Sequence, residues 1–194
     1  MRRVYETNVF GPLSVVQAAA PGMIRRRSGL IVNVASIVGA VATPWAGFYT
    51  SSKAAVINFS DCLRLELAPF GVRVVTLNPG AVQSRIVANT EPLLAKMLAG
   101  LDLYRPFSHK IAERASLSQA SGSTPTQVFA SGVVDTLLGK SPPAEIWAGH
   151  MSGAFKLIRG LPIWARDALW RRRFGLSATL PPAGPASAAA AGPG

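Results

Sequence analysis

Two short apolar runs rich in β-branched residues flank a long segment with helical periodicity, and this arrangement constrains the fold most. The runs cover residues 30–35 and 72–77, and the segment between them, 49–68, has its apolar stripe at Val56, Phe59, Leu63 and Leu67. Short apolar runs of this kind predict buried strands of a parallel sheet. A strand, a long helix and a second strand form a βαβ unit, whose strands are parallel and whose crossover is right-handed. The sequence therefore predicts an α/β protein.

The remaining segments extend this pattern. We expect helices over 5–26, 91–101 and 126–138, a short strand over 144–148, and a helical segment over 155–174 that breaks at 160–162. Pro12 and Pro21 are expected to bend or interrupt the first helix, because proline removes a backbone donor. From residue 177 onward the chain is almost entirely Ala, Pro and Gly, which cannot bury an apolar face. We therefore expect one domain over 1–176 and a disordered tail over 177–194.

Composition excludes several classes of protein. Of the 194 residues, 49% are hydrophobic, which is far too many for a disordered chain and enough for a real core. The single cysteine, Cys62, excludes an intramolecular disulfide and fits a reducing compartment. No signal-peptide apolar region follows Met1, and the longest apolar stretch, 30–48, has too many polar interruptions for a membrane span of ~20 residues. No spacing typical of metal ligands is present, so no metal site is expected.

The net charge of +11, from 20 Lys and Arg against 9 Asp and Glu, needs an explanation. Such a surface can attract nucleic acid, anionic lipid or phosphorylated small molecules. No helix-turn-helix, zinc-finger spacing or RNA-binding aromatic motif is present, so nucleic acid is not an expected partner. A solvated surface explains the arginine cluster at 25–27, whereas the cluster at 171–173 belongs to a segment that also carries two tryptophans.

The loop and helix after the first strand carry residues suited to acid–base chemistry. Tyr49 and Lys53 are four residues apart, so they lie on one face of a helix. A phenol has a reference pKa of about 10, and an adjacent ammonium group lowers that pKa by stabilising the phenolate. Ser36, at the end of the first strand, could hydrogen-bond the same substrate oxygen. Each residue alone has an ordinary structural explanation, but together they predict a site that protonates or deprotonates an alcohol.

Four elements in a fixed order give the chain a family resemblance. They are Asn8-Val-Phe-Gly, then Ser36, then Tyr49-Thr-Ser-Ser-Lys53, and finally Asn78-Pro79-Gly80-Ala-Val82-Gln-Ser84. With Ser36 thirteen residues before Tyr49, this order closely resembles the short-chain dehydrogenases/reductases over roughly residues 4–176. The resemblance implies a Rossmann-like doubly wound parallel sheet and an oxidoreductase that uses a nicotinamide dinucleotide.

The resemblance also implies a role for each catalytic residue. Tyr49 is the general acid/base, and Lys53 lowers its pKa and contacts the nicotinamide ribose. Ser36 polarises the substrate carbonyl, and Asn8 holds a water that continues a proton relay to Lys53. The helices that carry Asn8 and Tyr49 are the family's usual dimer surface, so a homo-oligomer is expected.

The expected cofactor site is incomplete. The loop of Pro79, Gly80, Val82 and Ser84 matches the family's segment that holds the nicotinamide carboxamide. The family's pyrophosphate site is a Gly-rich turn of the pattern TGxxxGxG between a strand and a helix, and no segment of this sequence supplies it. We therefore expect the C-terminal part of the family's domain, with the first four strands missing and the strand at 30–35 exposed as a sheet edge. The chain alone should bind NADP(H) weakly or not at all.

The flanking sequences narrow the resemblance. The segments that begin at Tyr5-Glu-Thr-Asn, Tyr104-Arg-Pro and Arg173-Phe-Gly-Leu are similar to those of fungal 1-acyldihydroxyacetone-phosphate reductases. This likeness implies NADPH-dependent reduction of a small lipidic ketone to an alcohol. It also implies a location at the cytoplasmic face of the endoplasmic reticulum or of lipid droplets.

The segment 161–174 leaves the function open. It mixes two tryptophans, aliphatic residues and three consecutive arginines, which is typical of an interfacial helix on anionic lipid. A helix that covers the substrate pocket of a soluble enzyme has the same composition. Three functions therefore stand: a reductase of a lipidic ketone, a non-catalytic remnant or interaction module that keeps only the substrate half, and a binder of anionic membrane surfaces.

Overall fold

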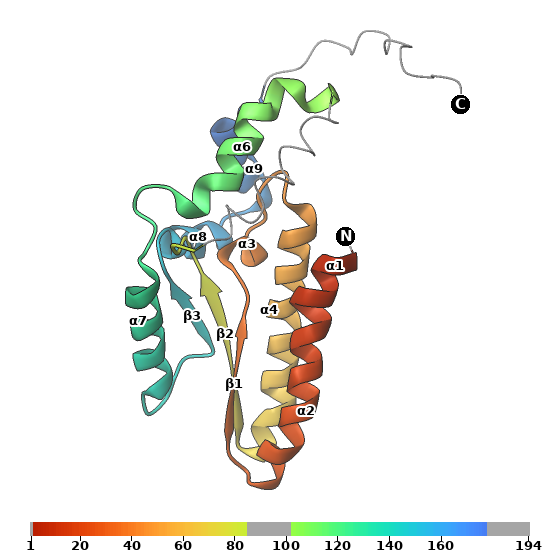
Figure 1. Cartoon of the computed structure of the whole chain (residues 1–194), viewed down its shortest axis with the longest axis vertical. Helices are drawn as coiled ribbons and strands as arrows, with labels where there is room; N and C mark the ends of the chain where they lie inside the picture. The colour runs from red at the N-terminus through yellow and green to blue at the C-terminus, as the bar shows by residue number, and fades with distance from the viewer. Residues whose placement is uncertain (1, 85–101, 178–194) are drawn as a thin grey trace, which may run out of the picture.

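A three-stranded parallel sheet forms the centre of the computed structural model, which describes residues 2–84 and 102–177. The strand order is β1 (Gly29–Val34), β2 (Val72–Pro79) and β3 (Glu145–Ala148). The long helix α4 (Gly47–Leu67) connects β1 to β2 and ends in the 3₁₀ turn η2 (Ala68–Phe70). The predicted βαβ unit is therefore confirmed (Figure 1).

Helices cover both faces of the sheet, as in a doubly wound fold (Figure 1). One face carries α4 and a continuous helical segment made of α1 (Arg2–Tyr5), the π-helical turn η1 (Glu6–Phe10) and α2 (Gly11–Arg25). The other face carries α7 (Thr126–Leu138). The buried cores of the two faces are Val16, Ile31, Leu67, Val72 and Val74 on the first, and Val75, Leu77, Val133 and Ile146 on the second.

Short helices cover the carboxyl ends of the strands. They are α3 (Ile37–Ala40), α6 (Ser108–Ser116), α8 (Ser152–Arg159) and α9 (Ile163–Phe174), with the 3₁₀ turns η3 (Asp102–Phe107) and η4 (Leu117–Gln119) on either side of α6. Figure 1 shows α6 and α9 together beyond the sheet, and a hydrogen bond from Arg173 to Glu113 joins them. In open parallel sheets, ligands bind outside the carboxyl ends of the strands.

Most of the predicted elements are confirmed. α7 spans the predicted 126–138, β3 lies within the predicted strand, and the C-terminal helical segment breaks between α8 and α9 as expected. Pro21 lies inside α2 without ending it. The sequence did not predict α6, and the helix expected at 91–101 and the tail at 178–194 lie outside the described residues. Within the described ranges, no helix combines the length and the apolar character needed to cross a bilayer.

β1 is an open edge of the sheet in the described part of the chain, where it pairs with β2 alone. Ile31 and Asn33 are buried, whereas Val34 is 53% exposed. A groove beside this edge is lined by β1, by the N-terminal helical segment that includes Asn8, and by Lys53 of α4. The predicted exposed sheet edge is therefore confirmed.

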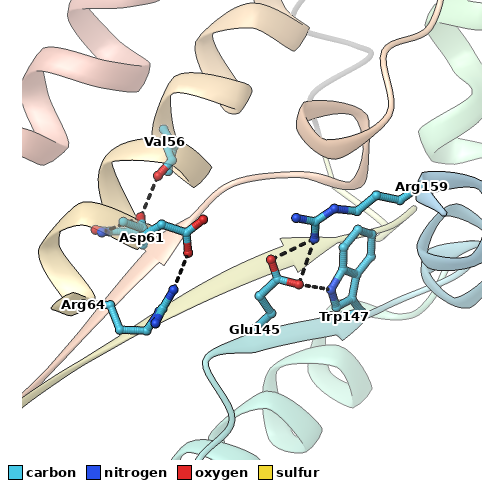
Figure 2. A network of polar contacts seen from close by, with 8 residues as sticks. Val56, Asp61, Arg64, Glu145, Trp147 and Arg159 are labelled. Carbon is cyan, nitrogen blue, oxygen red and sulfur yellow. Dashed lines mark hydrogen bonds and ion pairs between the residues drawn. The ribbon is translucent and has the colours of Figure 1, made fainter. Parts of the chain in front are cut away.

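The carboxylate of Glu145 fixes α8 to β3. Its two oxygens accept hydrogen bonds from Arg159 Nη1 over 2.8 and 2.9 Å, and one of them also accepts from Trp147 Nε1 over 3.0 Å. Figure 2 shows the three side chains together. Burial acts to raise the pKa of Glu145, but the hydrogen bonds from Arg159 and Trp147 outweigh it, so this pKa lies below its ordinary value. The Arg159 guanidinium also lies over the Trp147 ring, 5.8 Å from its centroid.

Candidate active site

Three contacts fix the position of α4 against the end of β1. Asn33 Nδ2 donates to Ser60 Oγ over 2.9 Å in the buried core. Nearer the carboxyl end of the strand, Lys53 Nζ donates to the Val34 carbonyl over 2.9 Å. Gly39 lets α3 approach α4 closely, because a Cβ at this position would lie 2.7–2.9 Å from the backbone and Cβ of Lys53. These contacts hold the helix that carries Tyr49 in a defined register.

Ser36 and Tyr49 come together where β1 ends. Ser36 is the N-cap of α3, and its Oγ accepts a weak hydrogen bond from the Val38 N–H over 3.4 Å. The same hydroxyl lies close enough to the phenol of Tyr49 to act on it as a hydrogen-bond donor, which acts to lower the pKa of the phenol. Ser36 therefore has an ordinary capping role and also contacts the group expected to transfer the proton.

The electrostatics of Tyr49 differ from the prediction. Burial raises the pKa of its phenol above the ordinary 10.0, and the opposing effects of the Ser36 hydrogen bond and the Arg114 charge are smaller. Lys53 is directed to the Val34 carbonyl, and burial lowers the pKa of its own ammonium group. The expected lowering of the Tyr49 pKa by Lys53 is therefore wrong for this structure, because desolvation of the phenol dominates.

Asn8 lies in the π-helical turn beside α4. Its Nδ2 donates to Ser52 Oγ over 3.0 Å, and Ser52 is fully buried. Pro12, four residues later, has no N–H to donate to the Asn8 carbonyl, and its ring crowds that carbonyl. The helix accommodates this with a π turn, a distortion often found at functional sites. Asn8 and Lys53 line the same groove, so the structure brings these two residues to one place.

The loop after β2 is held between two other segments. A Cβ at Gly80 would collide with the His150 carbonyl, so only glycine fits there. Isolated bridges join Ala81 to His150 and Val82 to Thr124. Pro79 and Gly80 therefore position Val82 and Ser84 at the carboxyl end of the sheet.

A side-chain carboxamide already contacts this loop. Gln119 Nε2 donates to the Val82 carbonyl over 2.9 Å and to Ser84 Oγ over 3.4 Å, while Gln119 Oε1 accepts from the Ser84 N–H over 2.8 Å. One primary amide thus pairs with a donor and an acceptor of the same loop. Nothing in the sequence pointed to Gln119, because this contact joins segments that are 35 residues apart.

The residues present fit one end of a nicotinamide dinucleotide. The nicotinamide ring carries a primary carboxamide, the group that the Val82 carbonyl and the Ser84 N–H accommodate in Gln119. The pyrophosphate end is different, since no turn of the pattern TGxxxGxG follows a strand in either described range. The described residues therefore fit the nicotinamide end alone.

Arg114 of α6 is a site residue that the sequence did not predict. Its Nε and Nη2 donate to Thr43 Oγ1 over 3.3 and 2.9 Å, and its charge acts on the Tyr49 phenol. Burial lowers the pKa of its guanidinium, whereas Tyr49 raises it. The sequence of α6 is polar apart from a few residues such as Ile111, the one that is buried. Such a pattern does not indicate that the helix lies near Tyr49.

Aromatic side chains hold α6 and α9 over the loop that leads to Tyr49. The Trp45 ring lies 6.1 Å from that of Phe107 and 5.5 Å, edge-on, from that of Phe174. Trp170 extends the cluster, 5.9 Å from Phe174. Trp45 has a φ of 59°, an uncommon conformation for a bulky side chain, and the surrounding rings hold it there.

Comparison with known proteins agrees with this geometry. Residues 1–93 match the family model of the short chain dehydrogenases. A short-chain dehydrogenase from Penicillium ochrochloron is 32% identical over 176 residues, which cover 91% of this chain and 63% of that protein. A short-chain dehydrogenase/reductase from Pestalotiopsis microspora is 36% identical, covering 90% of this chain and 60% of that protein. The NADPH-dependent 1-acyldihydroxyacetone phosphate reductase of Schizosaccharomyces pombe is 32% identical, covering 83% and 57%.

Solved structures agree on the fold. A short-chain dehydrogenase from Streptomyces avermitilis superposes with a TM-score of 0.67 at 23% identity, covering 92% of this chain and 63% of that one. One from Burkholderia cenocepacia, solved in complex with NADP, gives a TM-score of 0.63 at 23% identity, covering 86% and 56%. The chain spans about three fifths of the length of the curated relatives it matches. By sequence, fold and site together, the chain belongs to the short-chain dehydrogenase/reductase family.

Proposed function

We propose that this chain carries the proton-transfer half of an NADP(H)-dependent reductase, which converts the ketone of a 1-acyldihydroxyacetone phosphate-like lipid to an alcohol. The observation that carries the proposal is the proximity of the Ser36 hydroxyl to the Tyr49 phenol, whose pKa it acts to lower, at the carboxyl end of a parallel sheet. Lys53 lies one helical turn from Tyr49. The Schizosaccharomyces pombe relative supports the cofactor and the substrate class, because its name specifies both.

In this reaction NADPH, held at its nicotinamide end by the loop of Pro79, Gly80, Val82 and Ser84, would supply the hydride for the carbonyl carbon. Ser36 donates a hydrogen bond to the carbonyl oxygen, and Tyr49 gives its phenolic proton to that oxygen as the alcohol forms. Because the pKa of Tyr49 lies above 10.0, the phenol is protonated at neutral pH and can act as the acid. Lys53 then returns a proton to Tyr49, and Asn8, which lines the same groove, holds the water that feeds Lys53.

Two substitutions test the catalytic roles. At millimolar NADPH, which offsets the weak cofactor binding expected for this chain, Tyr49→Phe and Ser36→Ala should each lower kcat by about 10²–10⁴-fold in NADPH oxidation with 1-acyldihydroxyacetone phosphate, with unchanged circular dichroism. Tyr5→Phe is the matched control, because its hydroxyl only donates to Ser51 on the outer surface of α4. Activity that survives Tyr49→Phe rejects the proposal and favours a non-catalytic interaction module.

Association with anionic membranes is a second proposed function. At the start of α9 and just before it, Leu161, Ile163 and Trp164 are 41%, 68% and 75% exposed. The same helix carries Arg171 and Arg172, and this mixture suits a lipid interface. The location that we propose is accordingly the cytoplasmic face of the endoplasmic reticulum or of lipid droplets.

Liposome flotation tests the membrane proposal. Trp164→Ala should reduce recovery with vesicles that contain anionic lipid, and vesicles of neutral lipid should recover less protein. Leu138→Ala, an 80% exposed residue at the end of α7, is the control and should float as the wild type does. Equal flotation of the wild type and Trp164→Ala rejects a membrane role for this helix.

Self-association is proposed for the helices that carry Asn8 and Tyr49. Phe10, Val15 and Leu65 on these helices are 51%, 68% and 68% exposed, so the surface has apolar area for a second copy. Light scattering after size exclusion should give a dimer mass that Leu65→Glu reduces to a monomer. A monomeric wild type contradicts this part of the proposal.

A further inference from the structure

Among the described residues Arg114 differs from Arg173, which contacts the same helix, in having no acidic partner. The adjacent Glu113 binds Lys110 over 2.9 Å and Arg173 over 2.6 Å. Arg114 instead donates to the neutral hydroxyl of Thr43. Across residues 2–84 and 102–177, no carboxylate forms an ion pair with its guanidinium.

The guanidinium of Arg114 lies close to the group that is expected to transfer the proton. It is partly withdrawn from water, and its charge acts on the Tyr49 phenol. Thr43 belongs to the loop between α3 and α4, which leads directly to Tyr49. The structure thus places a cation from α6 beside the Ser36–Tyr49 pair.

In the part of the chain that the structure describes, Arg114 is a partly buried cation whose partner is a hydroxyl, which is an unusual arrangement. Removing a charge from water costs free energy that a neutral hydroxyl offsets only in part. Arginine has five N–H donors in a planar fork, which suits the oxygens of a phosphate or a carboxylate. The contacts with Thr43 use one N–H each of Nε and Nη2, so the other donors form no hydrogen bond within residues 2–84 and 102–177.

We propose that Arg114 binds an anionic phosphate group of the ketone substrate, close to the carbonyl that Tyr49 protonates. This inference rests on the proposed reductase function of the Ser36–Tyr49 pair. Because the guanidinium acts on the Tyr49 phenol, the phosphate and the carbonyl must be close together in the substrate. A ketone with a phosphate ester on the adjacent carbon has this geometry.

The test compares two ligands that differ only in charge. They are 1-acyldihydroxyacetone phosphate and the same lipid without its phosphate, and their binding to the 194-residue chain is measured by calorimetry without cofactor. The wild type should bind the phosphate ester about 10–100-fold more tightly, as expected for hydrogen bonds to a charged group. Arg114→Gln should lose this preference and bind the uncharged ketone unchanged.

The control variant is Arg73→Gln, which removes an exposed arginine on β2 and should keep the preference. A wild type without a preference for the phosphate ester overturns the inference, and so does an Arg114→Gln variant that retains it. NADPH oxidation separates this result from the proposed function. A preference without reduction of either ketone, even at millimolar NADPH that offsets the weak cofactor binding, rejects the reductase alone. Equal binding and equal reduction of both ketones rejects the Arg114 site alone.

Discussion

Arg173 Nη2 lies 2.6 Å from Oε1 of Glu113, so one ion pair joins the last described helix, α9, to α6. Lys110 Nζ reaches the other oxygen of the same carboxylate over 2.9 Å. Arg114 and Phe174 are the residues that follow Glu113 and Arg173, so this pair connects the proposed phosphate site to the aromatic cluster around Trp45. An ion pair therefore helps to hold α6 and α9 together over the site.

Acid is expected to weaken this connection. Hydrogen bonds from Lys110 and Arg173 lower the pKa of Glu113 from 4.5 to about 2. A depressed carboxyl pKa contributes stability that is present above 4.5 and is lost as the pH falls through about 2. Tryptophan emission, to which Trp45 and Trp170 on either side of the α6–α9 connection contribute through their packing on Phe174, should therefore change within this window, and more so at low salt. The same acid transition in Glu113→Gln would contradict the assignment.

Removing the Gln119 carboxamide is expected to improve binding of the nicotinamide end of the cofactor. Gln119 occupies the Val82 carbonyl and the Ser84 N–H, which the nicotinamide carboxamide needs in the proposed complex. The Gln119 and nicotinamide carboxamides would compete for the same two hydrogen bonds, so Gln119→Ala should lower the Kd of nicotinamide mononucleotide about 5- to 30-fold. Titration followed by NMR measures this effect.

The matched control for that experiment is Gln83→Ala. The side chain of Gln83 is directed elsewhere, since its Nε2 donates to the Ser123 carbonyl over 3.3 Å. Its Kd for the mononucleotide should equal that of the wild type. Unchanged or weaker binding in Gln119→Ala would show that the two amides do not compete.

The 194-residue chain should gain little from the rest of the dinucleotide. The described residues fit the nicotinamide carboxamide but supply no Gly-rich turn for the pyrophosphate. NADPH should therefore bind about as weakly as nicotinamide mononucleotide, and calorimetry should detect no micromolar site. A micromolar Kd for NADPH would sink this prediction.

The hydrogen bond between Asn33 and Ser60 is expected to stabilise the position of α4. Both residues are buried, and Asn33 Nδ2 donates to Ser60 Oγ over 2.9 Å. Asn33→Ala should lower the free energy of unfolding by about 1–3 kcal/mol, measured by urea denaturation. A double-mutant cycle with Ser60→Ala should give a coupling energy on the order of 1 kcal/mol, and additive effects would rule out a direct contribution of this bond.

The sequence predicted those site residues that depend on local geometry. Tyr49 and Lys53 share a helix, and Ser36 follows a recognisable strand. Their spacing in the sequence was therefore enough to predict that they belong to one site. Arg114 and Gln119 reach the site across loops, and no spacing rule connects them to it. The pKa of Tyr49 was mispredicted for a related reason, because its desolvation depends on what packs over it rather than on the residue four positions along.

The same division applies to the fold. α7 has a regular apolar pattern and a proline at its N-cap, which fix both its existence and its start. α6 is short, polar and has one buried residue, Ile111, so its stability comes from contacts with α9 rather than from its own pattern. Tertiary contacts of this kind cannot be read from a single segment.

The open edge of β1 couples assembly to chemistry. Its six residues present an unpaired row of backbone groups in the described part of the chain, and the groove lined by Asn8 and Lys53 runs along that same edge. A strand added there would enclose the Lys53 ammonium and so make the groove a closed binding site. By thermodynamic linkage, any ligand that prefers the enclosed groove must also favour strand addition, to the same extent in free energy. Strand addition at β1 would then control ligand binding in the groove, because the two processes share one equilibrium.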